Sequence, residues 1–457
     1  MTGARPRRPA GRRYSTGMKR PAAATPASAP AAPTPETIFL RALDLLRGWE
    51  AGGAWQEELP AAAEGAGRGV LQNGLLTLFR RRAVLDWVLA RFCTRPVRPR
   101  LRRLLWWALA QLFWGRAPAP VVADLAVQVA RRRGSPAEAG FVNAVLRAVV
   151  AAGPERLLAE AAAPGAPLHV RLSLSPELAA AWAGRLAPAE LERLAALLLT
   201  PAPVTVRRRR RPAGAAVADS ATGAELAPGL EPLPAPAFAP GAELFLAVAP
   251  ERFFASAAFR AGGYYVQDPS TLLAPALLAV RPGEAVADLC AAPGGKALLL
   301  AEALAGAGTL FCGDRSPERL RRVAENLREW GNVTIAAADA TRPPLPLPPG
   351  SRDAVLLDAP CSNTGVIRRR PDVRWRFSRA GLAELVALQR AILEGAAPLI
   401  RAGGRLVWST CSIEPEENGL QVRRFLAEHP EFTLESECQL LPAALHDGAY
   451  AARLRRV

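Results

Sequence analysis

The chain has 457 residues, of which 50% are hydrophobic and 22% charged. This length predicts two or three domains, and the composition excludes a wholly disordered chain. Lysine and arginine outnumber aspartate and glutamate by 58 to 41, a formal net charge of +17 that is typical of proteins that meet nucleic acid or an anionic membrane surface. Because no stretch reaches the roughly 18 uncharged apolar residues of a spanning helix, we expect a soluble protein without a membrane partner. Six scattered cysteines with no CxxC pair argue against a metal site and are typical of free thiols in a reducing cytosol, so we expect a cytoplasmic protein.

The chain divides into four segments by composition and periodicity. Residues 1–35 hold six arginines, one lysine and no acid, which predicts a disordered basic leader. Residues 36–155 carry apolar positions at helical spacing with no strand signal and predict an all-α domain. Residues 156–255 predict a connecting region with a small α/β unit. In residues 256–457, apolar strands alternate with helices, which predicts a doubly wound parallel sheet.

The last segment contains five apolar runs that predict strands. Helical spacing separates successive runs, and the ligands of such sheets bind at the carboxyl ends of the strands. The predicted strands are residues 285–290, 309–312, 333–337, 354–358 and 405–409.

A turn rich in small residues follows the first predicted strand. Residues 288–296 read DLCAAPGGK, and the glycines allow the backbone to approach a ligand closely. Neither the phosphate-binding GxxxxGK[ST] loop nor GxGxxG is present. Asp314 ends the second strand, where a carboxylate is placed to accept hydrogen bonds from a ribose, although an acid there is often only a helix cap. These features indicate a nucleoside-type cofactor without a pyrophosphate.

Two cysteines and one lysine fall on the strand-end loops. Lys296 is the one lysine outside the leader, which indicates that an ammonium group is needed there. Cys361 and Cys411 follow the fourth and fifth strands. A buried structural role is the common alternative for a cysteine, but a thiolate beside a cation is a nucleophile at neutral pH.

Two arginine-rich stretches could meet RNA. Residues 207–211 are five consecutive arginines, and residues 363–375 place arginines around Trp375. Arginine binds phosphates and tryptophan stacks on exposed bases, but both stretches are equally compatible with solvated loops.

Several strings together resemble one family. Residues 265–270 (YVQDPS), 288–296, 358–375 (DAPCSNTGVIRRRPDVRW) and 409–418 (STCSIEPEEN) are similar to motifs of the Nol1/Nop2/Sun family of RNA cytosine-C5 methyltransferases. Residues 141–147 (FVNAVLR) resemble the NusB-like RNA-binding domain. The pairing is similar to the RsmB (Sun) type, and it implies an all-α NusB-like domain followed by a Rossmann-like class I domain that binds S-adenosylmethionine.

The resemblance also implies residue roles. The TCS motif makes Cys411 the nucleophile that attacks carbon 6 of cytosine, and the DAPC motif makes Cys361 the group that helps to release the product. Asp358 would hold the polar edge of the base, Asp314 the cofactor ribose and Asp339 the adenine side, with residues 290–296 around the methionine moiety. The implied cofactor-binding set is Cys290, Ala291, Ala292, Pro293, Gly294, Gly295, Lys296, Asp314, Asp339 and Asp358.

The implied partner is small-subunit (16S) ribosomal RNA, free or partly assembled, bound by a monomer. Transfer RNA or large-subunit rRNA remain alternatives, as do a DNA cytosine methyltransferase, whose nucleophile lies in a PC motif, and a non-enzymatic NusB-like RNA-binding or antitermination factor. The chain departs from the family at Arg208 and Arg209, at residues 447–450 (DGAY), and at Arg370, where a histidine is common.

Overall fold

The computed structural model describes residues 33–62, 66–212, 226–342 and 347–457. The predicted basic leader therefore lies almost wholly outside the described residues. Within the described ranges, no helix is both long and apolar enough to cross a membrane.

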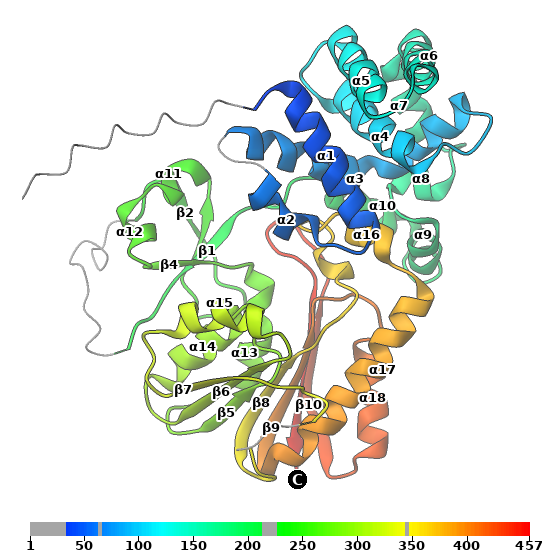
Figure 1. Cartoon of the computed structure of the whole chain (residues 1–457). Coiled ribbons are helices and arrows are strands. Elements are labelled where there is room, and N and C mark those ends of the chain that lie inside the picture. Colours follow the sequence, from blue (N-terminus) through cyan, green and yellow to red (C-terminus); the bar gives the residue numbers. More distant parts are fainter. Residues whose placement is uncertain (1–32, 63–65, 213–225, 343–346) are drawn as a thin grey trace, which may run out of the picture.

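The first part of the chain is a helical domain (Figure 1). Five of its helices, α1 and α4 to α7, have a proline in the first turn, where the missing N–H costs nothing. The start of α6 also has a capping box between Ser135 and Glu138. Buried side chains such as Trp106 and Leu75 form one core. The helices are α1 (Pro35–Glu50), α2 (Trp55–Ala62), α3 (Ala66–Phe92), α4 (Pro99–Trp114), α5 (Ala119–Arg133), α6 (Pro136–Ala152) and α7 (Pro154–Ala162).

A connecting unit follows the helical domain. Its antiparallel sheet has the strand order β2-β3-β1-β4, and because β4 pairs with β1, the sheet extends past residue 255, the boundary expected from the sequence. The elements are α8 (Leu168–Leu172), α9 (Pro176–Ala183), α10 (Pro188–Leu198), β1 (Thr205–Arg208), β2 (Leu230–Leu233), β3 (Leu244–Ala247), α11 (Pro250–Phe254), α12 (Ala257–Arg260) and β4 (Tyr264–Val266).

The C-terminal α/β domain is built on a seven-stranded sheet of order β10-β11-β9-β8-β5-β6-β7. Strands β9, β8, β5, β6 and β7 are parallel, and β11 is antiparallel to both of its neighbours. The predicted fold class is confirmed, and each predicted strand is present. The strands are β5 (Ala285–Asp288), β6 (Thr309–Asp314), β7 (Val333–Ala337), β8 (Arg352–Asp358), β9 (Ile400–Thr410), β10 (Phe432–Leu440) and β11 (Ala449–Arg456).

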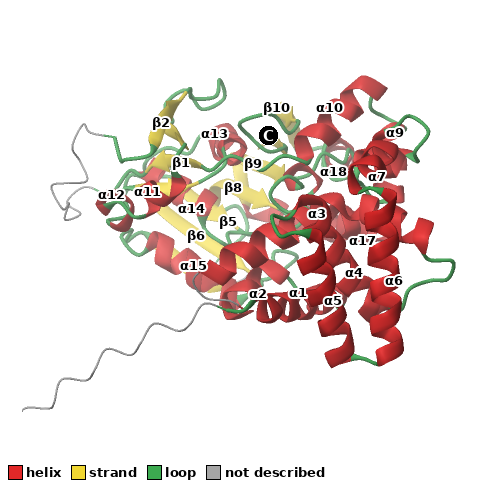
Figure 2. Cartoon of the chain, turned by 90° about the horizontal axis from the view of Figure 1, so that it is seen from above, coloured by secondary structure: helices red, strands yellow, loops and turns green. Residues whose placement is uncertain are grey.

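Helices cover both faces of this sheet (Figure 2). Alternate residues of one strand point to opposite faces, so Val355 and Leu357 pack under α17 and α18, whereas Ala354 and Leu356 pack under α13, α14 and α15. The helices are α13 (Leu273–Leu278), α14 (Gly295–Leu304), α15 (Pro317–Leu327), α16 (Val373–Arg376), α17 (Arg379–Ala396) and α18 (Gly419–Glu428), with short turns η1 (Pro269–Leu272), η2 (Thr364–Val366) and η3 (Ala397–Leu399).

The segment after β8 joins the α/β domain to the other two parts, and α16 lies between the sheet and the helical domain in Figure 1. The indole N–H of Trp375 donates to the Phe79 carbonyl at 2.7 Å. Arg374 is fully buried, and its guanidinium donates to the carbonyls of Ser173 and Leu198 at 2.9 and 3.0 Å. The loop that carries Cys361 is therefore held between all three parts of the chain.

Candidate active site

The glycine-containing turn after β5 lies against the end of β6. Gly294 has φ +107°, and a Cβ there would come within 3.1 Å of the Val323 backbone, so glycine is required. The N–H of Ala291 donates to the Gly313 carbonyl at 2.8 Å. The turn thus brings the start of α14 beside Asp314.

Asp314 is largely buried at the end of β6. One carboxylate oxygen accepts the Ser316 N–H at 2.9 Å, and the other accepts the Ala292 N–H at 3.3 Å and lies 3.5 Å from Arg319. The alternative that Asp314 serves as a helix cap is therefore supported, since its carboxylate accepts backbone N–H groups from two loops. It also lines the cavity beside them, so both roles are compatible.

A cavity of about 720 Å³ opens at the carboxyl ends of the parallel strands. Its size is in the range of ligand sites. Glu57 of α2 also lines it, so the helical domain contributes to its wall. Ala291, Gly294, Gly295 and Lys296 are not among the lining residues. The predicted site residues that do line it are Cys290, Ala292, Pro293, Asp314, Asp339, Asp358, Cys361 and Cys411.

The two cysteines meet in this cavity. Strands β8 and β9 are parallel neighbours, which brings their end loops together, and the Sγ atoms of Cys361 and Cys411 lie 3.2 Å apart. The hydrogen bond with Cys411 and burial raise the pKa of the Cys361 thiol well above its usual value. Cys361 therefore rests as a thiol beside Cys411.

Asn363 orients the sulfur of Cys411. It adopts the left-handed backbone conformation, with φ +60°, and its amide Nδ2 donates to the Cys361 carbonyl at 2.8 Å. This bond turns Oδ1 toward Cys411, whose thiol donates to it at 3.1 Å. Asn363 was not among the predicted site residues, although it lies within the DAPCSNTG string.

Behind the thiols, a polar network joins the two cysteine loops. Glu417 accepts the backbone N–H of Ser362 at 2.8 Å and a side-chain N–H of Gln389 at 2.9 Å. Ser362 and Ser412, the residues directly after the two cysteines, lie 3.1 Å apart between their hydroxyl oxygens. Glu417 was also missed at the sequence level, where the EPEEN string could have indicated it.

Lys296 and Asp358 form an ion pair next to the thiols, with Nζ to Oδ2 at 2.7 Å. Burial lowers the pKa of Lys296, but the Asp358 carboxylate outweighs it, so the net pKa is raised and the ammonium stays charged. The lysine therefore fixes the position of Asp358 instead of lining the cavity itself.

Asp288 is a buried carboxyl that the sequence analysis did not assign. It is fully buried at the end of β5, and within the described part of the chain its Oδ2 has no hydrogen-bond partner. Burial, and then the nearby Asp358 carboxylate, raise the pKa of Asp288 to about 7. An unpartnered buried oxygen next to the glycine turn fits a site that receives a polar ligand.

The residues fit a nucleoside-type cofactor. The carboxylates of Asp314 and Asp339 line the cavity on the side of β6 and β7, and Cys290, Ala292 and Pro293 bring backbone to the same wall. Carboxylates are suitable acceptors for ribose hydroxyls, and the glycine turn supplies close backbone approach. The roles of the individual residues in binding remain predictions.

The arginines after Cys361 are mostly used inside the protein. Arg368 donates to the carbonyls of Ala444 and Pro201, both at 2.8 Å, and Arg369 pairs with Asp268 and Asp447 at 2.6 and 2.5 Å. The prediction that this loop offers its side chains to RNA phosphates or bases is therefore wrong for Arg368, Arg369, Arg374 and Trp375. These side chains hold the loop in place.

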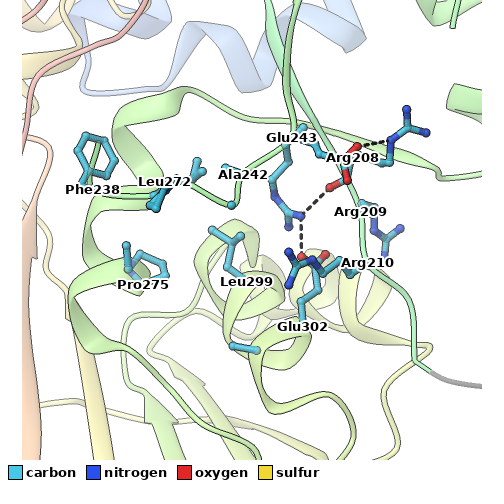
Figure 3. Close-up of a pocket in the computed structure, with 16 residues that line it drawn as sticks. Arg208, Arg209, Arg210, Phe238, Ala242, Glu243, Leu272, Pro275, Leu299 and Glu302 are labelled. Atoms are coloured by element: carbon cyan, nitrogen blue, oxygen red, sulfur yellow. Dashed lines mark hydrogen bonds and ion pairs between the residues drawn. The ribbon is translucent and has the colours of Figure 1, made fainter. Parts of the chain in front are cut away.

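In the run at residues 207–211, Arg210 is exposed, whereas the other arginines are engaged with protein groups (Figure 3). Arg207 is buried and donates to Gln267 at 2.6 Å and to Glu302 of α14 at 2.7 Å. Arg208 pairs with Glu243 at 2.8 Å, and Arg209 donates to the Asn326 carbonyl at 3.2 Å. These contacts tie β1 to α14 and α15 along the wall of a smaller pocket of about 340 Å³.

The fold and the site define a methyltransferase domain joined to a helical domain. Residues 275–451 match the family described as 16S rRNA methyltransferase RsmB/F, and residues 40–151 match the NusB family. The chain therefore combines a NusB-family domain with an RsmB/F methyltransferase domain. S-adenosylmethionine is the cofactor of this class of methyltransferase, which confirms the expected cofactor at that level.

Among curated proteins, the chain is 40% identical over 179 residues to the "Probable ribosomal RNA small subunit methyltransferase B" of Synechocystis sp., covering 39% of this chain and 40% of the relative. It is 42% identical over 205 residues to the "Ribosomal RNA small subunit methyltransferase B" of Erwinia tasmaniensis, covering 43% and 48%. The match thus spans less than half the length of these relatives.

Among solved structures, PH0851 is 25% identical with a TM-score of 0.74, covering 93% of this chain and 99% of that one. A "Methyltransferase Homolog Protein" from Pyrococcus horikoshii is also 25% identical, with a TM-score of 0.51, covering 63% and 97%. The first similarity extends over the helical domain, the connecting unit and the α/β domain.

Proposed function

We propose that the protein methylates carbon 5 of a cytosine in small-subunit ribosomal RNA, with S-adenosylmethionine as methyl donor and a covalent bond to Cys411 during the reaction. The contact between the Cys361 and Cys411 sulfurs, 3.2 Å apart in the cavity that Asp314 also lines, carries the proposal. The match to the RsmB/F family and the printed names of the relatives support small-subunit rRNA as the substrate.

The chemistry accounts for a nucleophile next to the base. Carbon 5 of cytosine is a poor nucleophile until a group adds to carbon 6. Cys411 gives its thiol proton to solvent and its Sγ bonds to carbon 6, and N3 takes up a proton from solvent as the electron pair of the carbon 5–carbon 6 double bond becomes available at carbon 5. Asp358, fixed by Lys296, accepts the N3–H hydrogen bond and stabilises the charge that develops there.

The cofactor supplies an electrophilic methyl group on a sulfonium, which carbon 5 accepts. The ring then carries both a methyl group and a hydrogen at carbon 5. Cys361 gives its thiol proton to solvent and takes the carbon 5 proton in its place, and N3 releases the proton that it took up. The electron pair left at carbon 5 restores the double bond and expels Cys411 as a thiolate, which takes a proton from solvent, so both cysteines return to their starting thiols.

The target cytosine must reach this cavity from an unpaired or flipped position. The cavity lies at the ends of the strands, with Glu57 of the helical domain in its wall. We therefore expect free or partly assembled small-subunit RNA, in which the base is accessible, to be the better substrate. Purified 30S subunits are the comparison substrate.

The test is methylation with radiolabelled S-adenosylmethionine on four substrates: 16S rRNA, 23S rRNA, bulk transfer RNA and a DNA copy of the 16S sequence. The expected result is label in 16S rRNA alone, with bisulfite sequencing placing it at one cytosine. Label in transfer RNA or 23S rRNA would show that the proposed substrate is wrong. Label in DNA would show that the protein is a DNA methyltransferase instead. Specific RNA binding with no label in any substrate would favour a non-enzymatic RNA-binding protein.

A further inference from the structure

We propose that Arg370 binds a phosphate of the RNA strand next to the cytosine that enters the cavity. The inference deepens the proposed function and rests on it. It starts from the difference between Arg370 and the neighbouring arginines on the same loop.

The neighbouring guanidiniums are occupied by protein groups. Arg368 and Arg374 donate to backbone carbonyls, and Arg369 is held by two carboxylates. Arg376 donates to the Gly52 carbonyl at 3.3 Å. A guanidinium with its donors so engaged has little left to offer a phosphate, and moving it would leave buried acceptors unpaired.

Arg370 is different in both respects. Its side chain is exposed, and no protein group among the described residues hydrogen-bonds to it. It lines the same cavity as Cys361 and Cys411. Its backbone is nevertheless fixed, because its N–H donates to the Val366 carbonyl at 2.9 Å and its carbonyl accepts the Val373 N–H at 3.1 Å. A free guanidinium is thus held on an ordered turn in the wall of the cavity that contains the two thiols.

The charges around the cavity favour this position for an anion. The other walls carry the carboxylates of Glu57, Asp314 and Asp339, which repel a phosphate. Lys296, close to the thiols, is already paired with Asp358. Of the other two lining arginines, Arg319 is engaged with the Ala292 carbonyl at 3.0 Å, and Arg315 is exposed next to Asp314.

A nucleotide that places its base against Cys411 keeps its phosphates outside, at the rim of the cavity. The planar fork of an exposed arginine matches two phosphate oxygens and gives a strong, charge-assisted contact. Such a contact fixes the strand without reading its sequence. Arg370 is therefore a positioning residue for the RNA and takes no part in the chemical steps.

The test uses the full chain and a 12-nucleotide oligocytidylate as the binding probe. Arg370→Gln is compared with Arg370→Lys, which keeps a point charge, and with Arg281→Gln. Arg281 is an exposed arginine just before β5, at the opposite edge of the sheet from the cavity. Binding is measured between 50 and 200 mM salt without cofactor.

The binding constant falls as salt rises, and each phosphate contact on a single strand adds about 0.7 to the steepness of the plot of log K against log salt. Arg370→Gln loses one contact, so between 50 and 200 mM salt its binding constant should fall by a factor about 2.6 times smaller than the factor for the wild type. Arg370→Lys should keep most of the slope, and Arg281→Gln all of it. In turnover with RNA, Arg370→Gln should raise KM for RNA and leave the Kd for S-adenosylmethionine unchanged.

An Arg370→Gln slope equal to that of the wild type would overturn the inference. A reduced slope in Arg315→Gln, with that of Arg370→Gln unchanged, would also overturn it. The phosphate would then lie at Arg315, which follows Asp314 at the cofactor end of the cavity. The two proposals fail separately: a changed slope with no methylation of any RNA rejects the proposed function, whereas normal methylation with an unchanged slope rejects the role of Arg370.

Discussion

The sulfur of Cys361 lies 3.2 Å from the sulfur of Cys411, at the ends of two neighbouring parallel strands. Two thiols so close can act in turn on one base, and their order decides what each substitution does. Cys411→Ala should abolish methylation and form no covalent RNA complex, because nothing adds to carbon 6. In Cys361→Ala, Cys411 should still add to carbon 6 and carbon 5 should still accept the methyl group, but the RNA should not be released, so protein and RNA should run together as a slow, denaturant-resistant band on a gel.

Cys438→Ala, a cysteine of β10 that does not line the cavity, is the matched control and should turn over normally. A trapped band with Cys411→Ala would reverse the two roles. The enzyme would then use the arrangement of DNA cytosine methyltransferases, in which the PC motif supplies the nucleophile.

Cofactor binding should depend on Asp314. If its carboxylate accepts the ribose hydroxyls, Asp314→Ala leaves those donors unpaired and should weaken the binding of S-adenosylmethionine by roughly 1 to 3 kcal/mol. Isothermal calorimetry measures this. Because Asp314 also accepts the backbone N–H of Ser316, a thermal melt must show that the variant is folded. Glu318→Ala, an exposed acid in the first turn of α15, should bind the cofactor as the wild type does, and an equal Kd for both variants would reject the assignment.

The sequence was most informative where local chemistry sets the structure. The strands, the glycine turn and the two strand-end cysteines follow from periodicity and from the rule that parallel strands place their ligands at one edge. Neither of the two alternatives predicted for the loop holds for Arg368 and Arg374, because a guanidinium that binds carbonyls from residues about 170 to 200 positions away leaves no local signal. Arg368 and Arg374 look solvated in sequence and are buried in the fold.

The raised pKa of Asp288 predicts a pH dependence of stability. The folded chain keeps this proton up to about pH 7, whereas an unfolded aspartate releases it near pH 4. Between these values the unfolded state binds fewer protons, so the free energy of unfolding should fall as the pH rises, by at most about 1.4 kcal/mol per pH unit. Asp288→Asn mimics the protonated form and should lack this decline.

Urea denaturation of both proteins from pH 4 to pH 8 measures the difference. The variant should gain stability relative to the wild type as the pH rises and level off above pH 7. Parallel profiles for the two proteins would show that Asp288 does not titrate in this window. Asp353→Asn is a suitable comparison, because the pKa of this half-buried carboxyl is lowered whereas that of Asp288 is raised.

Arg374 should hold the three parts of the chain together. It is fully buried, and its guanidinium donates to carbonyls of the connecting unit, Ser173 and Leu198, and of the helical domain, Arg80, at 2.9 to 3.3 Å. Burial, and then the charge of the neighbouring Arg80, lower the pKa of Arg374 to about 9. Removing the side chain leaves these acceptors buried and unpaired, each at a cost of about 1 to 3 kcal/mol.

Arg374→Ala should therefore lower the melting temperature and split one thermal transition into two, because the helical domain no longer melts together with the α/β domain. Arg379→Ala, which removes an exposed arginine at the start of α17, should melt as the wild type does. Removing residues 36–155 should lower the melting temperature of the remaining chain further, since it also exposes Trp375 and the surface beneath α2, and should impair methylation even of short RNAs. A truncated protein that keeps the melting temperature and the activity of the full chain would show that these contacts contribute nothing to the catalytic half.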